Sequence, residues 1–227
     1  MRLALTFVLA VACLRGDTLK EILDRMDAES VKFHAVKADL KHVVYGSVFK
    51  EETVSTGVLT LVKEKKGIAA LVEFLTPDPK QYLFRDNQVQ EFLPKLNLIN
   101  DMDMGKASGA INQFVTLAFG ASGKDLQKSY HVAMKGAETL KIGDKEVKVT
   151  RLVLVPKSAE ALELVKKIEL WVPEGKSYSV QLKAFQKSGD TNSEIYSNLE
   201  MNPPALLTGH PIELKAPKNA KHEKINK

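Results

Sequence analysis

Residues 67–94, GIAALVEFLTPDPKQYLFRDNQVQEFLP, decide which fold the chain can form. They contain three short segments rich in apolar and aromatic residues, separated by TPDP (76–79) and DN (86–87). The two prolines lack backbone N–H donors and therefore interrupt a strand ladder. The Asp-Asn pair tolerates the backbone of a tight turn. Strands joined in order by tight turns predict an antiparallel meander.

Outward from this meander, the same alternation of apolar and polar residues recurs on both sides. It predicts about ten strands in all, and the further segments are 31–45, 53–63, 130–135, 146–155, 166–172, 178–184 and 191–200. Strands connected mostly in order predict a mainly β fold, a single curved antiparallel sheet that closes into a barrel or half-barrel. The segment 17–214 reads as one domain, and the lysine-rich segment 215–227 as a disordered basic tail.

Two segments have the periodicity of helices. Residues 17–30 place Leu19, Ile22, Leu23 and Met26 on one face, with Asp17 as the candidate N-cap. Residues 106–119 carry a broad apolar stripe that ends at the glycines of 120–123. Both apolar faces need a surface to cover, and the sheet is the candidate.

Residues 1–16 have the features of a signal peptide, which predicts export. A positive start at Arg2 is followed by an apolar run and by Ala10-Val11-Ala12, a small-x-small cleavage site. The single cysteine, Cys13, has two interpretations: it is an apolar residue of the signal, or it is the lipidated first residue of a mature lipoprotein. In either case the mature chain has no cysteine pair for a disulfide or a zinc site.

The net charge of +5 comes from the ends of the chain. Residues 215–227 carry +4 and the two arginines of the leader carry +2, so residues 17–214 carry −1. A body without a basic face argues against a nucleic-acid partner.

Recognisable catalytic motifs are absent from the sequence. The five histidines share no metal-ligand spacing, and the sequence has neither a Gly-x-Ser-x-Gly elbow nor a glycine-rich phosphate loop. Asp101 and Asp103 are two residues apart, but the glycine and glutamate of a calcium loop do not follow in register. The sequence therefore predicts a non-catalytic protein that holds no metal and no cofactor.

Several strands, notably 68–75, lack a clean polar face. One interpretation is a solid core covered by the two helices. The other is a curved sheet that surrounds an apolar cavity, with the helices as a lid, since small barrels of this geometry hold a lipid or similar ligand.

The order and spacing of the segments resemble the LolA family of periplasmic lipoprotein carriers. The likeness covers roughly residues 17–205 and includes LKEILDRM, AVKADL, GVLTLVKEKKG, residues 71–94, SYHVAMKG, VTRLVLVPKS and residues 166–200. It implies an unclosed β-barrel with helices over its opening and an apolar cavity for lipoprotein acyl chains. It also implies a monomer in the periplasm that receives its cargo from an inner-membrane transporter and delivers it to an outer-membrane acceptor.

The sequence departs from the family in the hairpin around residues 63–67. The family has an arginine followed by proline there, and that arginine holds the lid shut, whereas this chain has Lys65-Lys66-Gly67. A lysine offers a point charge instead of a planar five-donor fork. Lys65 and Lys66 are therefore only candidate lid contacts.

The leading hypothesis is a non-catalytic carrier of lipoprotein acyl chains. The rivals are a membrane-anchored acceptor or envelope lipid sensor tethered through Cys13, and an envelope lipid-modifying enzyme. The candidate cavity residues are Leu40, Leu59, Leu61, Leu71, Phe74, Phe92, Leu152, Leu170 and Leu182 from strands, with Phe114, Ala118 and Phe119 from the lid helix. A one-residue slip in any strand would exchange its two faces.

Overall fold

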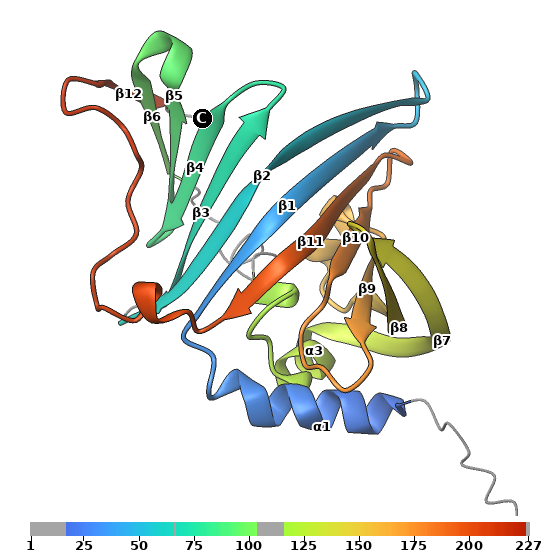
Figure 1. Cartoon of the computed structure of the whole chain (residues 1–227). Helices are drawn as coiled ribbons and strands as arrows, with labels where there is room; N and C mark the ends of the chain where they lie inside the picture. The colour runs from blue at the N-terminus through green and yellow to red at the C-terminus, as the bar shows by residue number, and fades with distance from the viewer. Residues whose placement is uncertain (1–16, 66, 104–115, 226–227) are drawn as a thin grey trace, which may run out of the picture.

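The computed structural model describes residues 17–65, 67–103 and 116–225 (Figure 1). Within them, one sheet contains twelve strands in the order β12-β6-β5-β4-β3-β2-β1-β11-β10-β9-β8-β7. The sheet is strongly curved and does not close, which confirms the predicted mainly β fold (Figure 1). The prediction of a wholly antiparallel sheet is wrong at one place, because β12 pairs with β6 in parallel.

The first half of the sheet is the meander that the central stretch predicts. Its strands are β1 (Ala35–Gly46), β2 (Glu51–Glu64), β3 (Gly67–Thr76), β4 (Lys80–Arg85), β5 (Gln88–Leu93) and β6 (Leu98–Asp103). The breaks fall at the expected turn residues: Asp86 and Asn87 adopt positive φ angles of 49° and 66° between β4 and β5. A short 3-10 helix, η1 (Pro94–Leu96), joins β5 to β6.

The second half is another meander of sequential neighbours. It consists of β7 (Tyr130–Ile142), β8 (Lys145–Pro156), β9 (Lys167–Pro173), β10 (Gln181–Phe185) and β11 (Thr191–Met201). A short helix, α4 (Ala159–Leu164), connects β8 to β9. The two halves meet where β11 pairs with β1, which places strands from opposite ends of the chain at the centre of the sheet.

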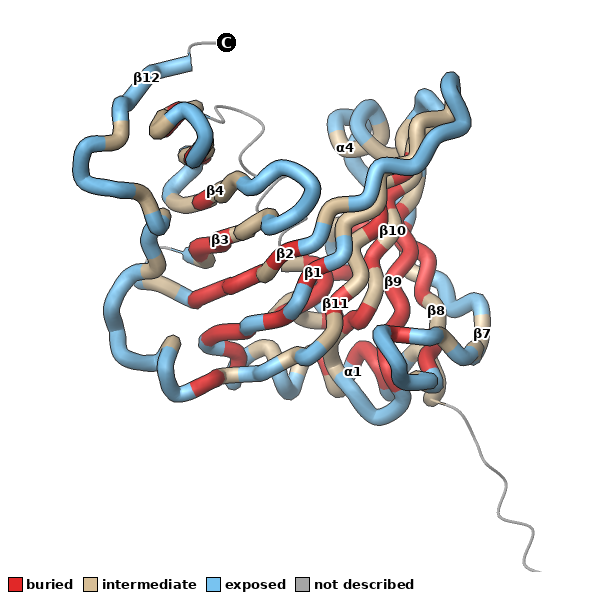
Figure 2. Tube along the Cα trace, turned by 45° about the horizontal axis from the view of Figure 1, so that its top comes forward, coloured by how far each residue is buried: buried red, intermediate tan, exposed pale blue. Residues whose placement is uncertain are grey.

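Two helices cover part of the concave side. The helix α1 (Leu19–Ser30) buries Ile22, Leu23 and Met26, as the periodicity predicts. Its N-cap is Thr18 in place of the expected Asp17, since the Thr18 hydroxyl and the Glu21 carboxylate cap each other's backbone N–H groups. The helix α3 (Gly123–Ser129) packs beside it, and Figure 2 shows the buried residues running along β9 and β10 above α1.

The close contact between these helices depends on a glycine. A Cβ at Gly123 would lie 2.4 Å from the carbonyl oxygen of Leu23 on α1. Of the predicted helix 106–119, residues 106–115 lie outside the described residues. Leu117, Ala118 and Phe119 are described and buried. No described helix is long and apolar enough to cross a membrane.

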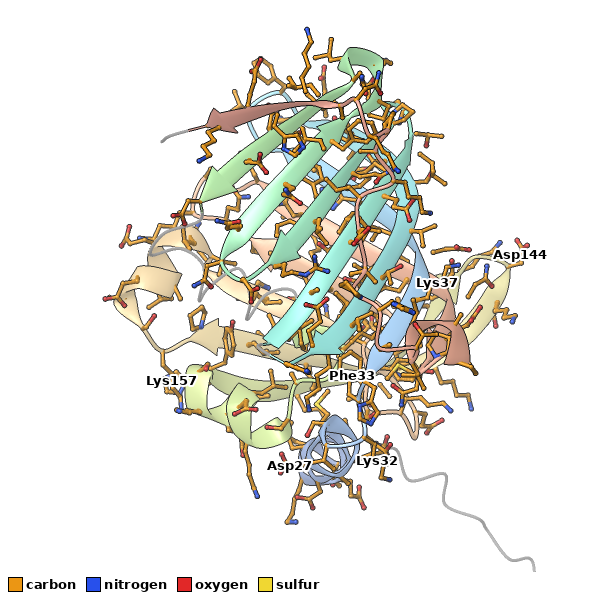
Figure 3. The ribbon with its side chains drawn as sticks, turned by 90° about the vertical axis from the view of Figure 1, so that its left-hand side faces the viewer. Asp27, Lys32, Phe33, Lys37, Asp144 and Lys157 are labelled. Carbon is orange, nitrogen blue, oxygen red and sulfur yellow. The ribbon has the colours of Figure 1, made fainter. Side chains whose placement is uncertain are left out.

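The C-terminal segment differs from the predicted disordered tail. After η3 (Pro204–Leu206) the chain crosses the convex face of the first half (Figure 3), and Lys221–Ile225 forms β12 on the edge of β6. All five residues of β12 are exposed. Backbone pairing with β6, together with the contact between His222 Nδ1 and Asp101 Oδ2 at 2.9 Å, holds this strand. An apolar pattern could not reveal it, because the strand buries no side chain.

Candidate functional site

The concave face of the first half is built by strands in mutual register. Leu40 on β1 lies opposite Gly57 on β2, and Gly57 lies opposite Phe74 on β3. Leu59 on β2 lies opposite Val72 on β3. Side chains on one pleated face point the same way, so these residues share the inner surface. Gly57 is required here, since an added Cβ would lie 2.0 Å from the carbonyl oxygen of Glu73 where β2 bulges against β3.

A cavity of about 230 Å³ opens on this face. Most of its wall is apolar or aromatic, and the lining residues are Leu40, His42, Leu59, Val72, Phe74, Tyr82, Phe84 and Glu194. They come from β1, β2, β3, β4 and β11, so the cavity spans the junction between the two halves of the sheet. An apolar wall with a few polar groups is typical of a small-molecule site.

A row of rings crosses the cavity wall from β1 to β4. The ring centroids of His42 and Phe74 are 5.8 Å apart, those of Phe74 and Tyr82 are 6.2 Å apart, and those of Tyr82 and Phe84 are 6.3 Å apart. The ammonium of Lys80 lies 5.9 Å and 5.4 Å from the ring centroids of Phe74 and Tyr82. The rings present a broad apolar surface, and Lys80 places a cation beside it.

Glu194 brings a carboxyl group into the cavity wall. It stands opposite His42 in the β1–β11 ladder, and the hydroxyl of Tyr196 donates a hydrogen bond to its Oε2. Burial raises the pKa of Glu194, although this hydrogen bond opposes the shift. Tyr196 is itself buried and packs edge-to-face on Phe119, with ring centroids 4.8 Å apart. The carboxyl group is thus held from one side by a fixed tyrosine.

Two further titratable groups of the cavity have shifted pKa values. Burial lowers the pKa of His42, and the charge of Lys80 adds to this effect. Burial also raises the pKa of Tyr82, whose hydroxyl donates to Glu91 Oε1 at 2.6 Å. Glu91 additionally accepts a hydrogen bond from Asn100 Nδ2 at 2.9 Å. The neutral forms of His42 and Tyr82 are therefore favoured, as expected for a site shielded from water.

The candidate cavity residues fall into separate groups in the structure. Leu40, Leu59 and Phe74 line the cavity. Leu61, Ala118 and Phe119 belong to the buried cluster next to it. Leu152, Leu170 and Leu182 belong to a different buried cluster, beneath α1 and α3.

Two of the candidates, Leu71 and Phe92, face the convex side. Leu71 pairs with Thr60, the neighbour of the inward residue Leu59, so Leu71 points outward. Phe92 pairs with Gln81, the neighbour of the inward residue Tyr82, so Phe92 points outward as well. The C-terminal segment covers this side: Lys215 Nζ lies 2.8 Å from the Glu73 carboxylate, and Lys215 N donates to Gln81 Oε1 at 2.7 Å. Because β3 is apolar on both faces, its sequence does not indicate which of its residues point to the concave side.

The remaining candidates lie elsewhere. Lys65 borders a groove between the β2–β3 hairpin and the C-terminal segment, together with His34, Asp86 and His210. Lys66, Phe114 and Cys13 lie outside the described residues.

Other residues of the site do not follow from apolar periodicity. His42, Val72, Tyr82, Phe84 and Glu194 line the cavity without being among the candidates. The phase of each strand could have pointed to them, since His42 follows Leu40 by two residues and Glu194 precedes Tyr196 by two. The described residues contain no group of three or more His, Cys, Asp or Glu side chains placed to hold a metal ion.

At the base of the sheet, Asp27, Lys32 and Phe33 lie together where α1 leads into β1 (Figure 3). Asp27 Oδ1 accepts a hydrogen bond from the backbone N–H of Lys124 at 3.0 Å, which ties α1 to α3. Phe33 is buried against Gly120, where an added Cβ would lie 2.7 Å from its ring. Although Phe33 and Gly120 are in close contact, a second cavity of about 310 Å³ opens at this end, with Met26, Lys32 and Tyr178 in its lining.

Comparison with known proteins gives similarity in structure alone. No family model and no curated protein matches the sequence. An uncharacterized conserved protein from Thermus thermophilus is similar over 91% of this chain and 98% of its own, with 14% identity and a TM-score of 0.51. The lipoprotein LppX of Mycobacterium tuberculosis is similar over 81% of this chain and 97% of its own, with 8% identity and a TM-score of 0.47.

A LolA superfamily protein from Nitrosomonas europaea is also similar, over 85% of this chain and 98% of its own, with 13% identity and a TM-score of 0.36. At such identities a structural likeness shows the fold, and function has to be argued from the site. The chain has the fold of a curved, unclosed β-sheet with helices on its concave side, and the Thermus thermophilus protein is similar to it in this fold.

Proposed function

We propose that this protein is a non-catalytic carrier that holds a lipid acyl chain in its concave cavity. The observation that supports this proposal is the cavity of about 230 Å³ lined by Leu40, Leu59, Val72, Phe74 and Phe84. Apolar side chains left facing a cavity lose both burial and packing unless a ligand covers them. An acyl chain is a ligand of that chemistry.

The energetic reason for such a carrier is the cost of exposing hydrocarbon to water. Each methylene that leaves water gains about 0.8 kcal/mol, so a long acyl chain needs shielding on any aqueous route. The curved sheet supplies that shielding from five strands at once. The described residues around the cavity offer no nucleophile–base pair of the kind that lipid hydrolysis needs, which favours binding over turnover.

The cellular role in this proposal follows from the leader and from the family resemblance. The protein is exported through residues 1–16 and works in the periplasm. There it takes lipoprotein acyl chains from an inner-membrane transporter and passes them to an acceptor at the outer membrane. Tethering through Cys13 would turn the same cavity into an anchored acceptor, and fractionation of a Cys13→Ser variant distinguishes the two.

The test is native mass spectrometry of the mature protein purified from its own envelope, followed by extraction and identification of the bound lipid. A stoichiometric acylated peptide or lipid supports the carrier. A clean apo mass, together with failure to take up an apolar fluorescent probe, contradicts it.

A matched pair of variants locates the site. Val72→Trp fills the cavity and should abolish uptake of the probe. Val54→Trp is the control on β2, because Val54 is 41% exposed and lies outside the cavity lining. Equal uptake by both variants would place the binding site elsewhere.

A further inference from the structure

The apolar wall of the cavity is interrupted by two polar side chains that face each other. Glu194 on β11 and His42 on β1 are directly paired in the ladder, and both line the cavity. The hydroxyl of Tyr196 donates a hydrogen bond to Oε2 of Glu194. Across the described ranges 17–65, 67–103 and 116–225, Oε1 of Glu194 and the two ring nitrogens of His42 have no hydrogen-bond partner. Three polar atoms are thus available to whatever enters the cavity.

A second carboxyl group nearby, that of Glu91, has a hydrogen-bond donor at each of its two oxygens. Glu91 accepts from Tyr82 at Oε1 and from Asn100 at Oε2. It does not line the cavity. Among the described residues, the buried side-chain atoms without a hydrogen-bond partner are Asn97 Oδ1 and Arg151 Nε, so Oε1 of Glu194 is open to the cavity and not sealed in the core. A cavity for pure hydrocarbon would be better served by an apolar residue at position 194. The difference between Glu91 and Glu194 points to a polar group on the ligand.

We infer that Glu194 and His42 form a polar subsite for the head group of a single-chain amphiphile, an uncharged head with a hydroxyl or amide hydrogen-bond donor. The chain of this amphiphile lies against Leu40, Leu59 and Phe74. This inference rests on the proposed acyl-chain cavity and adds the class of head group.

The chemistry of the subsite selects such a head. An O–H or N–H of the ligand donates to Oε1 of Glu194, and the neutral imidazole of His42 supplies one donor and one acceptor for the rest of the head. Burial shifts the pKa of Glu194 upward and that of His42 downward, so both groups favour their uncharged forms. A carboxylate head has no hydrogen-bond donor to offer to Oε1 of Glu194, and its charge would lose hydration in the cavity.

The position of Lys80 defines the opposing hypothesis. Its ammonium lies over Phe74 and Tyr82 and lowers the pKa of His42 through its charge. In the opposing hypothesis, a fatty-acid carboxylate binds to Lys80 beside these two rings, and Glu194 does not contact the head group. The test must separate these two orientations.

The experiment displaces diphenylhexatriene, a pure hydrocarbon probe, from the mature protein at mildly alkaline pH. The competitors are dodecanol, dodecanamide and dodecanoate, which share one chain and differ in the head. We expect dodecanol or dodecanamide to bind wild type about tenfold more tightly than dodecanoate, as one hydrogen bond to a shielded carboxyl group provides. Whichever of the two binds more tightly identifies the head as a hydroxyl or an amide.

Three variants check the assignment. Glu194→Leu should abolish the preference for the uncharged heads, whereas Glu194→Gln, which keeps an acceptor, should retain it. The control is Glu73→Gln, which changes a carboxyl group that pairs with Lys215 on the convex side and should leave the preference unchanged. Circular dichroism verifies that each variant is folded. If Glu194→Leu does not fold, the comparison of Glu194→Gln with wild type still tests the inference.

Two results overturn the inference and leave the carrier proposal standing. One is displacement of bound probe with equal affinity by all three competitors in wild type. The other is a preference for dodecanoate that Lys80→Met removes. If wild type fails to bind diphenylhexatriene at all, the carrier proposal fails as well, so the two failures are distinguishable.

Discussion

The two halves of the sheet present the same alternating pattern on their concave faces, and they use it differently. On β8, β9 and β10, inward residues such as Leu152, Leu170 and Leu182 are fully buried against α1 and α3. On β1, β2 and β3, the inward residues Leu40 and Leu59 border a cavity. Alternation determines which side chains face inward, whereas the element that covers them determines whether they pack or line a cavity.

The largest expected difference between the halves is in stability. Leu170→Ala removes a fully buried side chain from the helix-covered half and should lower the free energy of unfolding by about 2–5 kcal/mol. Leu59→Ala, at a position that borders the cavity, should cost less than about 2 kcal/mol, because fewer packing contacts are lost. Urea unfolding measures both values, and equal losses would show that the two halves are packed alike.

The second prediction concerns how much the contact between α1 and α3 contributes to stability. Gly123→Ala places a methyl group 2.4 Å from the Leu23 carbonyl oxygen and should cost about 1–3 kcal/mol by separating α3 from α1. The control is Gly46→Ala at the end of β1, where the nearest atom to an added Cβ is 4.0 Å away. Thermal unfolding of the two variants tests this, and a neutral Gly123→Ala would mean that the helix contact adapts freely.

A third prediction concerns pH and the cavity half. Because the pKa of Glu194 is raised above its ordinary value of 4.5, the folded protein keeps a proton that the unfolded chain releases. The stability from this group is fully present below the ordinary pKa and is lost as the pH rises through the raised one. Wild type should therefore lose stability relative to Glu194→Gln as the pH rises, by at most about 1.4 kcal/mol per pH unit.

The measurement is urea unfolding of wild type and Glu194→Gln over a pH series. Parallel stability curves would contradict the shifted pKa. Glu91→Gln serves as the control for a carboxyl-to-amide change outside the cavity lining.

The smallest effect is expected at the sheet edge, outside both concave faces. His222→Ala removes the contact between His222 and Asp101. Because the His222 side chain is 56% exposed, the free energy of unfolding should fall by less than about 1 kcal/mol. Hydrogen exchange of the β12 amides is the sensitive readout. A global loss of stability as large as that of Leu170→Ala would show that the edge strand supports the core.

The sequence predicts the strands better than their faces. Turn residues such as Pro77, Asp86 and Asn87 mark the ends of β3, β4 and β5 because their backbones cannot continue a ladder. In the continuous apolar run of β3, apolar and polar residues do not alternate, so the sequence does not show which residues face inward. Only the pairing with β2 shows that Leu71 faces outward and Val72 inward. Likewise β12 depends on backbone pairing alone, which leaves no trace in an apolar pattern.

The candidate site shows the same division. Leu40 and Leu59 were predictable as inward apolar residues, because each belongs to an alternating strand, whereas the inward position of Phe74 follows only from the pairing of β3 with β2. Glu194 and His42 were not selected, although each lies two residues from an inward residue, since a charged or titratable residue in a strand is normally assigned to the solvent face. That the two residues face each other follows from the β1–β11 pairing, which joins residues distant in sequence and is not visible in either strand alone.

The pairing of β1 with β11 also has a consequence for how the chain folds. Among the described strands, every other antiparallel pair joins neighbours in sequence, so each meander can form locally and early. The β1–β11 seam joins Val36 to Met201 and has to close a very long loop, which is a slow step with a high entropic cost. The ligand cavity spans that seam, and we expect it to come into existence only with the last long-range step of folding.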